Sequence, residues 1–113
     1  MNDCVFCKII SKELPAKVVY ENETVLGFEN IRPEAPVHLL FVPKRHIEWT
    51  GDFSEETEKV LSHLIISAKN VAHEKKIDQA YKLIFNVGKT GHILHLHLHL
   101  LGGWRKKVPL HNI

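Results

Sequence analysis

Cysteine is scarce in this 113-residue sequence, and so are the long apolar runs of membrane proteins. Two cysteines are too few for the disulfide framework of a small secreted domain. No apolar run approaches the roughly 20 residues that a membrane-spanning helix needs. The N-terminus also lacks the basic and apolar regions of a signal peptide. The sequence therefore predicts a cytoplasmic protein that does not insert into a membrane.

An excess of charge of one sign is also lacking. Lysine and arginine number 15 against 13 aspartates and glutamates, which gives a formal net charge of +2. Such a small surplus does not predict a polyanion-binding surface. The one basic run, Arg105-Lys106-Lys107, is typical of a solvated tail. We expect no nucleic-acid partner.

Internal repeats and linkers rich in proline and glycine are missing, so residues 1–113 are expected to form one domain. Hydrophobic periodicity predicts a short helix over 5–14, ended by Pro15, and one long helix over 54–76. Strands are predicted over 17–21, 24–28, 37–42, 81–87 and 93–101. The fold class is therefore α+β: a five-stranded, mainly antiparallel sheet with one long helix and a short N-terminal helix.

An apolar stripe marks the buried face of the long helix. Its members recur at helical spacing: Val60, Leu61, Leu64, Ile65, Ala68, Val71 and Ala72. Asp52 or Ser54 is the expected N-cap, and the glutamates of the first turn suit the positive end of the helix dipole. The stripe is expected to pack on one face of the sheet.

Histidine, by contrast, is abundant: the chain has nine, and four of them fall within residues 92–99. His95, His97 and His99 alternate with leucines, so on a strand they share one face at steps of about 6.6 Å. The leucines then face the core. Solvent faces usually carry other polar residues, so this row predicts a site, an interface or a metal centre. The isolated histidines are interpreted as solvated side chains: His63, His73 and His111.

A row of imidazoles suits chemistry at phosphorus. A neutral imidazole is a nucleophile at about pH 7 without an activating base. A protonated neighbour can stabilise a phosphoryl oxygen or give a proton to the leaving group, and a third can fix the orientation. The row therefore favours covalent nucleotidyl or phosphoryl transfer, without naming the substrate.

Cys4 and Cys7 have the two-residue spacing of a zinc knuckle. A redox role or simple burial would also account for one such pair. Four-coordinate zinc needs two further ligands, so the pair alone does not define a site.

The sequence resembles the histidine-triad (HIT) family over most of its length. The segments that carry the resemblance stand in the family's order: Cys4-Val5-Phe6-Cys7-Lys8-Ile9-Ile10, Glu13-Leu14-Pro15-Ala16, Val19-Tyr20-Glu21, Ala35-Pro36-Val37-His38, Val42-Pro43-Lys44-Arg45-His46-Ile47, Asn86, Gly88, the alternating histidines and Leu101-Gly102-Gly103. The phosphoramidase-like branch is the most similar. The resemblance implies a HIT-like fold and hydrolysis of purine nucleoside phosphoramidates such as adenosine monophosphoramidate.

The resemblance also implies catalytic roles. His97, the middle histidine of the triad, would attack the α-phosphorus and become nucleotidylated, and water would then release the nucleoside monophosphate. His99 would contact the α-phosphate or the leaving group, while His95 completes the triad. His38 would support the triad from an adjacent strand, and Asn86 would hold a phosphate oxygen or the leaving amine.

The implied substrate pocket departs from the family at two places. Phe28 and Ile31 fall where the family binds the base and ribose, but Asn30 replaces a common aspartate that bonds the ribose hydroxyls. An asparagine can still donate and accept hydrogen bonds, without the charge. Gly91 and His92 stand where the family usually has a Gly-Gln pair, so His92 is the candidate proton donor to the leaving group.

A zinc site and a dimer follow from the same resemblance. Many bacterial HIT proteins complete the zinc tetrahedron with two histidines, which here are His46 and His95, beside Cys4 and Cys7. Structural zinc is therefore expected, with no organic cofactor. Family members of this size form homodimers edge to edge, and Trp104 begins a tail that would reach the partner's site.

Two other functions stay open. A dinucleoside polyphosphate hydrolase or a nucleotidyltransferase of the same family would share the chemistry and differ in the leaving group. A non-catalytic metal- or nucleotide-binding module would account for the density of metal ligands. The histidine at position 97 and the asparagine at position 86 speak against loss of catalysis.

Overall fold

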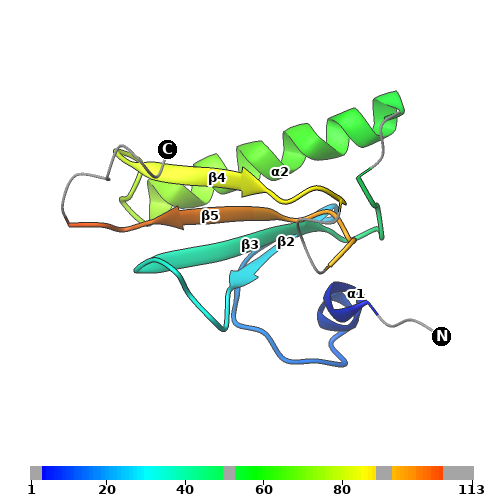
Figure 1. Ribbon diagram of the computed structural model, residues 1–113, viewed down its shortest axis with the longest axis horizontal. Coiled ribbons are helices and arrows are strands. Elements are labelled where there is room, and N and C mark those ends of the chain that lie inside the picture. The colour runs from blue at the N-terminus through cyan, green and yellow to red at the C-terminus, as the bar shows by residue number, and fades with distance from the viewer. Residues whose placement is uncertain (1–3, 50–52, 89–92, 106–113) are drawn as a thin grey trace.

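The computed structural model describes residues 4–49, 53–88 and 93–105. In these described residues, two helices and five strands follow one another (Figure 1): α1 (Val5–Ile10), β1 (Val18–Glu21), β2 (Val25–Glu29), β3 (Val37–Pro43), α2 (Glu55–Glu74), β4 (Tyr81–Phe85) and β5 (Leu98–Gly102). The strands form one antiparallel sheet in the order β1-β2-β3-β5-β4. The predicted α+β class is confirmed. Neither described helix is long and apolar enough to cross a membrane.

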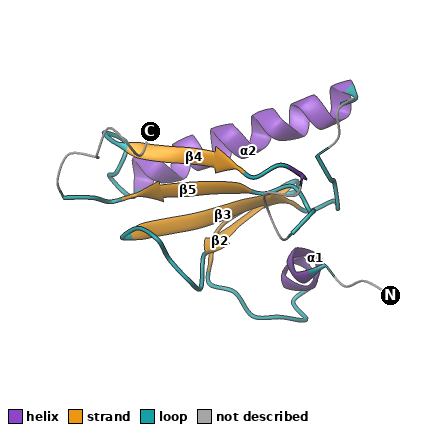
Figure 2. Ribbon diagram, viewed as in Figure 1, coloured by secondary structure: helices purple, strands orange, loops and turns teal. Residues whose placement is uncertain are grey.

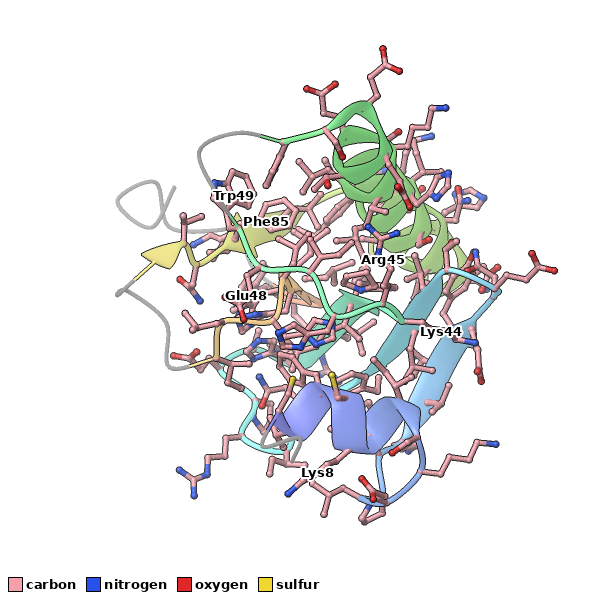
Figure 3. The ribbon with its side chains drawn as sticks, turned by 90° about the vertical axis from the view of Figure 1, so that its right-hand side faces the viewer. Lys8, Lys44, Arg45, Glu48, Trp49 and Phe85 are labelled. Carbon is pink, nitrogen blue, oxygen red and sulfur yellow. The ribbon has the colours of Figure 1, made fainter. Side chains whose placement is uncertain are left out.

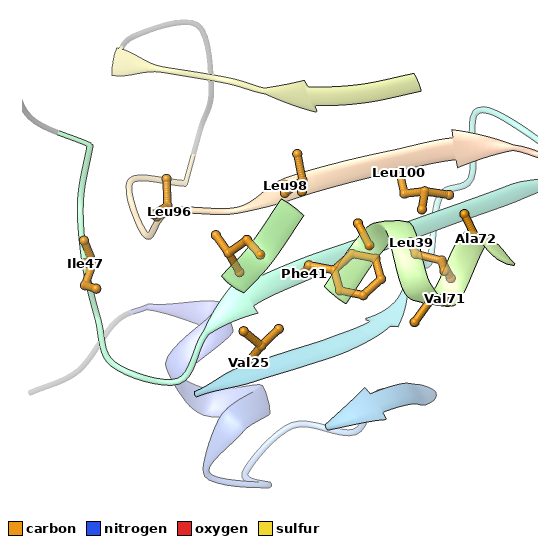
Figure 4. Close-up of a cluster of buried hydrophobic side chains, with 11 residues drawn as sticks. Val25, Leu39, Phe41, Ile47, Val71, Ala72, Leu96, Leu98 and Leu100 are labelled. Carbon is orange, nitrogen blue, oxygen red and sulfur yellow. The ribbon is translucent and has the colours of Figure 1, made fainter. Parts of the chain in front are cut away.

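The sheet is covered on both faces, by α2 on one side and α1 on the other (Figure 2). Alternate residues of the central strand β3 pack towards α2 and towards α1. Leu39 and Phe41 pack in the core under α2 (Figure 4), whereas Leu40 and Val42 pack with Phe6 of α1. A strand with both faces buried reads as a continuous apolar run, which is how residues 37–42 appear in the sequence.

Helix α2 packs on the sheet through the predicted stripe, with one exception. Ser54 is the N-cap, and its side chain accepts a hydrogen bond from the backbone N–H of Thr57. Leu64 and Ala68 are fully buried, but Ile65 is 41% exposed and was wrongly included in the stripe. Each helical residue turns by about 100°, so Ile65 lies at the margin of the stripe. The small Ser67 is buried at the other margin.

The ladder of β5 begins later than the sequence predicts, at Leu98 instead of Ile93. Before it, His95 makes only an isolated bridge with Glu48. Pro43, at the end of β3, has no N–H to donate to a longer β3–β5 ladder, and its carbonyl accepts from the His95 ring instead. The alternation of side chains persists, because the leucines at 96, 98 and 100 all lie in the core under α2 (Figure 4).

Helix α1 is shorter than predicted. It ends at Ile10, and Lys12 adopts a left-handed conformation with φ 69°. The backbone N–H groups of Glu13 and Leu14 both donate to the carbonyl of Lys8, which turns the chain back at this point. The turn directs the segment after α1 towards β1 and leaves the helix against the sheet.

Candidate functional site

Three histidines meet on the α1 face of the sheet: His38 of β3, His99 of β5 and His97 just before β5. The β3–β5 register pairs Leu40 with His99 and places His38 one step further along β3. The rings of His38 and His99 lie 5.1 Å apart between centroids, as do those of His97 and His99. Sheet pairing therefore gathers histidines that are far apart in the sequence.

Hydrogen bonds fix the tautomers of His38 and His99. The backbone N–H of Glu34 donates to Nδ1 of His38 at 3.1 Å, so the neutral ring carries its proton on Nε2. This Nε2–H donates to Nδ1 of His99 at 2.9 Å. His99 then carries its own proton on Nε2, which lies 3.2 Å from the side-chain nitrogen Nδ2 of Asn86. An amide nitrogen cannot accept this proton, so this tautomer requires the Asn86 oxygen and nitrogen to be exchanged. This chain of hydrogen bonds therefore leaves the N–H donor of His99 on Nε2, on the side of the ring away from His38.

The pair is uncharged near neutral pH. Burial, together with smaller effects of the nearby His97 and His38, lowers the pKa of His99 to about 4. Burial also lowers the pKa of His38, against a smaller opposing effect of Glu34. The lowered pKa values agree with the hydrogen bonds, because a proton on Nδ1 of His38 would displace the Glu34 N–H.

His97 is held as a nucleophile by the backbone. Its Nδ1 lies 2.8 Å from the carbonyl oxygen of His95, to which it donates, so the lone pair is on Nε2. The side chain is only 6% exposed, and the ring of Phe6 packs edge-on against it with centroids 5.2 Å apart. The ring therefore has both a defined tautomer and a defined orientation.

A cavity of about 480 Å³ opens beside His97 and His99. Its walls are mostly apolar, and α1, the segment after it, β2, β3 and the segment before β5 supply them: Val5, Phe6, Ile9, Leu14, Pro15, Ala16, Phe28, Leu40 and Ile93. Asn30 and the 89% exposed Ile31 also line it. The oxygen of Asn30 accepts from the Arg32 N–H at 2.9 Å, and its side-chain nitrogen lies 3.3 Å from Nε2 of His38. An apolar cavity with few polar groups suits a small organic ligand.

A second cluster lies at the N-terminal end of α1. Sγ of Cys4 and Nδ1 of His95 are 3.2 Å apart, and Sγ of Cys7 lies 3.2 Å from Nδ1 of His46. All four donor atoms lie within 4.8 Å of one another. Zinc bonds of about 2.3 Å to sulfur and about 2.1 Å to nitrogen place tetrahedral ligands at nearly this spacing. The two thiols and two imidazoles therefore fit a zinc ion.

Both histidines of this cluster direct Nδ1 at the cysteines, because Nε2 has another partner. Nε2–H of the buried His95 donates to the Pro43 carbonyl at 2.9 Å, and that of His46 donates to the carboxylate of Glu48 at 2.9 Å. Burial lowers the pKa of His95 and raises the pKa of the Cys4 thiol. A cation that binds here displaces the thiol proton.

The structure places most of the candidate residues in one of these two groups. His38, His97, His99 and Asn86 form the histidine group, with Phe28, Asn30 and Ile31 at the cavity. Cys4, Cys7, His46 and His95 form the metal-ligand cluster. Gly91, His92 and His111 lie outside the described residues. His63 is exposed on α2, where His73 pairs with Asp78.

Sequence reasoning missed Phe6 and Glu48. Phe6 packs against both His95 and His97, but an aromatic residue in a short apolar helix gives no such indication. Glu48 had a usable signal: it stands two residues after His46 in an extended segment, where alternate side chains share a face.

Known proteins share this architecture and much of this sequence. The family described as scavenger mRNA decapping enzyme C-term binding matches residues 3–108. The 14 kDa zinc-binding protein of Brassica juncea is 40% identical over 111 residues, which cover 95% of this chain and 98% of that protein.

Solved structures agree in fold. A HIT family hydrolase from Legionella pneumophila Philadelphia 1 has a TM-score of 0.86 at 41% identity, covering 95% of this chain and 98% of that one. A zinc-bound histidine triad family protein from Mycobacterium smegmatis has a TM-score of 0.76 at 32% identity, covering 91% and 76%. The chain therefore belongs to the histidine-triad family, whose solved members include proteins named HIT family hydrolases.

Proposed function

We propose that this protein hydrolyses purine nucleoside 5'-phosphoramidates through a nucleotidyl-histidine intermediate on His97. The observation that carries the proposal is the hydrogen bond from Nδ1 of His97 to the His95 carbonyl. It leaves the Nε2 lone pair free beside a cavity that also contains His99. The relatives named HIT family hydrolases support the reaction class.

The reaction divides into two displacements at the α-phosphorus. Nε2 of His97 attacks, a nitrogen–phosphorus bond forms, and the bond to the leaving nitrogen breaks. The leaving nitrogen keeps that electron pair, takes up a proton and departs as an amine. Water then attacks the same phosphorus, loses a proton and releases the nucleoside monophosphate with His97 restored. Two easier steps replace one difficult step.

His99 and Asn86 stabilise the charge that develops on the phosphoryl oxygens. The Nε2–H of His99 is fixed before the substrate arrives, because His38 already occupies Nδ1. The Asn86 amide lies beside it at 3.2 Å. Fixed donors of this kind need little reorganisation during the reaction, which is the main source of electrostatic catalysis.

We also propose that Cys4, Cys7, His46 and His95 bind structural zinc. The spacing of their donor atoms supports it, and so do the names of the Brassica juncea and Mycobacterium smegmatis relatives. Zinc supplies a cross-link between α1 and the segment before β5. Phe6 and Val5 of α1 form part of the cavity wall, so the cross-link steadies the substrate pocket.

A homodimer joined through β4 is a further proposal. β4 is an outermost strand of the described sheet, and Leu83 and Ile84 on it are 37% and 39% exposed. An exposed apolar edge strand is a template for pairing with a second copy.

Replacing His97 by alanine should abolish turnover. We expect release of AMP from adenosine 5'-phosphoramidate to fall by at least about 10³-fold, since the nucleophile is lost. Rapid quench and intact mass should show an adduct on the wild type and none on the variant. His73→Ala, on the exposed face of α2, is the matched control and should keep wild-type kcat. Turnover of diadenosine tetraphosphate but not of the phosphoramidate would favour the polyphosphate hydrolase instead.

Acidification should destabilise the fold through His99. Its pKa is about 4 in the folded state and roughly 6.5 in an unfolded chain. Between these values the unfolded state binds a proton that the folded state does not. The stabilisation is complete above pH ~6.5 and is lost as the pH falls towards 4. The free energy of unfolding, measured in urea, should fall when the pH is lowered from about 7 to about 5. For His99→Gln this fall should be about 1–2 kcal/mol smaller than for wild type. Equal losses would contradict the lowered pKa.

The purified protein should contain one zinc ion per chain. Elemental analysis should find close to one equivalent in wild type and much less in Cys7→Ser, because a hydroxyl is a poorer zinc ligand than a thiolate. Chelation should lower Tm together with kcat, since α1 is then released from His95. Less than a tenth of an equivalent after mild purification would rule out the site.

Charges on β4 should separate the dimer. The double variant Leu83→Lys and Ile84→Lys should sediment as a monomer at concentrations where wild type is a dimer, because lysine opposes edge pairing. Val18→Lys, on the opposite edge strand and 47% exposed, should remain dimeric. A monomeric wild type at all concentrations would refute the dimer.

A further inference from the structure

Glu48 contacts both histidines of the metal-ligand cluster, by different parts of the residue. Its backbone forms the isolated antiparallel bridge with His95. Its carboxylate accepts a hydrogen bond from Nε2 of His46 at 2.9 Å. The backbone N–H of Leu96 donates to the carbonyl of Ile47, which holds the two segments together at the same place. Figure 3 shows Glu48 on the extended segment that passes above α1, beside the Trp49 and Phe85 pair.

The two histidine ligands differ in how much the fold constrains them. His95 is 1% exposed, and the Pro43 carbonyl fixes its ring. The His46 side chain is 39% exposed, so packing restrains its ring far less. Rotation of that ring by a half-turn would direct carbon instead of Nδ1 at Cys7. The bond to Glu48 selects the orientation in which Nδ1 lies 3.2 Å from the Cys7 sulfur.

A surface ion pair would be the simpler explanation of the Glu48–His46 contact. The carboxylate side chain is 48% exposed, and exposed pairs contribute only about 0–1 kcal/mol to stability. That explanation predicts no effect on metal binding. An orienting partner of a metal-bound imidazole typically changes metal affinity by about 10–100-fold. The two explanations therefore differ in the zinc affinity that they predict for a protein without the Glu48 carboxylate.

We propose that Glu48 is a positioning residue for the metal site, which holds the His46 imidazole with Nδ1 directed at the cation. The proposal rests on the zinc site proposed above. Glu48 does not contact the cavity beside His97, so it acts on the metal through His46 and not on the substrate.

The test is the zinc affinity of the full chain, measured by competition with a chromogenic chelator. Glu48→Ala should bind zinc about 10–100-fold more weakly than wild type. Glu48→Gln should stay within about threefold, because its amide oxygen still accepts from Nε2–H. Glu74→Ala, which removes an exposed glutamate from α2 on the other face of the sheet, is the matched control and should equal wild type.

The results separate this proposal from the zinc site itself. Wild type that binds no zinc would remove both. Wild-type affinity in Glu48→Ala would refute the role of Glu48 and leave the zinc site standing. A second readout does not depend on metal: nitrogen-15 NMR of the zinc-free protein should show His46 mainly as the Nε2–H tautomer in wild type and as a mixture in Glu48→Ala. The same tautomer ratio in both proteins would also overturn the proposal.

Discussion

The alternation of histidine and leucine along residues 95–100 joins the core of this protein to its site. The three leucines are at most 4% exposed and pack under α2. A shift by one residue would move them to the other face and bury imidazoles in their place. The free energy that holds the leucines in the core therefore also fixes which way the histidines point. No separate interaction is needed to choose the face.

Hydrogen bonds then choose the reactive atom of each ring. His97 donates to a backbone carbonyl and exposes Nε2, while His95 donates to another and directs Nδ1 at the cysteines. His99 receives its bond from His38 and keeps a proton for the cavity side. In each of these three rings, a hydrogen bond to one nitrogen decides whether the other nitrogen carries a proton. A neutral imidazole is both donor and acceptor, so one fixed partner determines the role of the other nitrogen.

The sequence was sufficient for the fold class, because periodicity reports burial directly. It also separated the clustered histidines from those on α2. It could not show where the β5 ladder begins, since that depends on Pro43, in a different strand. Ile65 was misjudged because a residue at the margin of a stripe is buried or exposed by the helix's exact rotation. The contact of Phe6 with His97 is also invisible in sequence, because it arises only when α1 packs on the sheet.

His95 explains why the row has three histidines although only two of them line the cavity. Its ring serves the metal-ligand cluster, and its carbonyl oxygen holds the proton of His97. These are different atoms of one residue, so a movement of the ring is transmitted to the carbonyl only through the short backbone between them. Phe6 packs against both rings and limits that movement. The metal-ligand cluster and the nucleophile are thus separate in chemistry but share one rigid residue, which makes the order of α1 a condition for the geometry of His97.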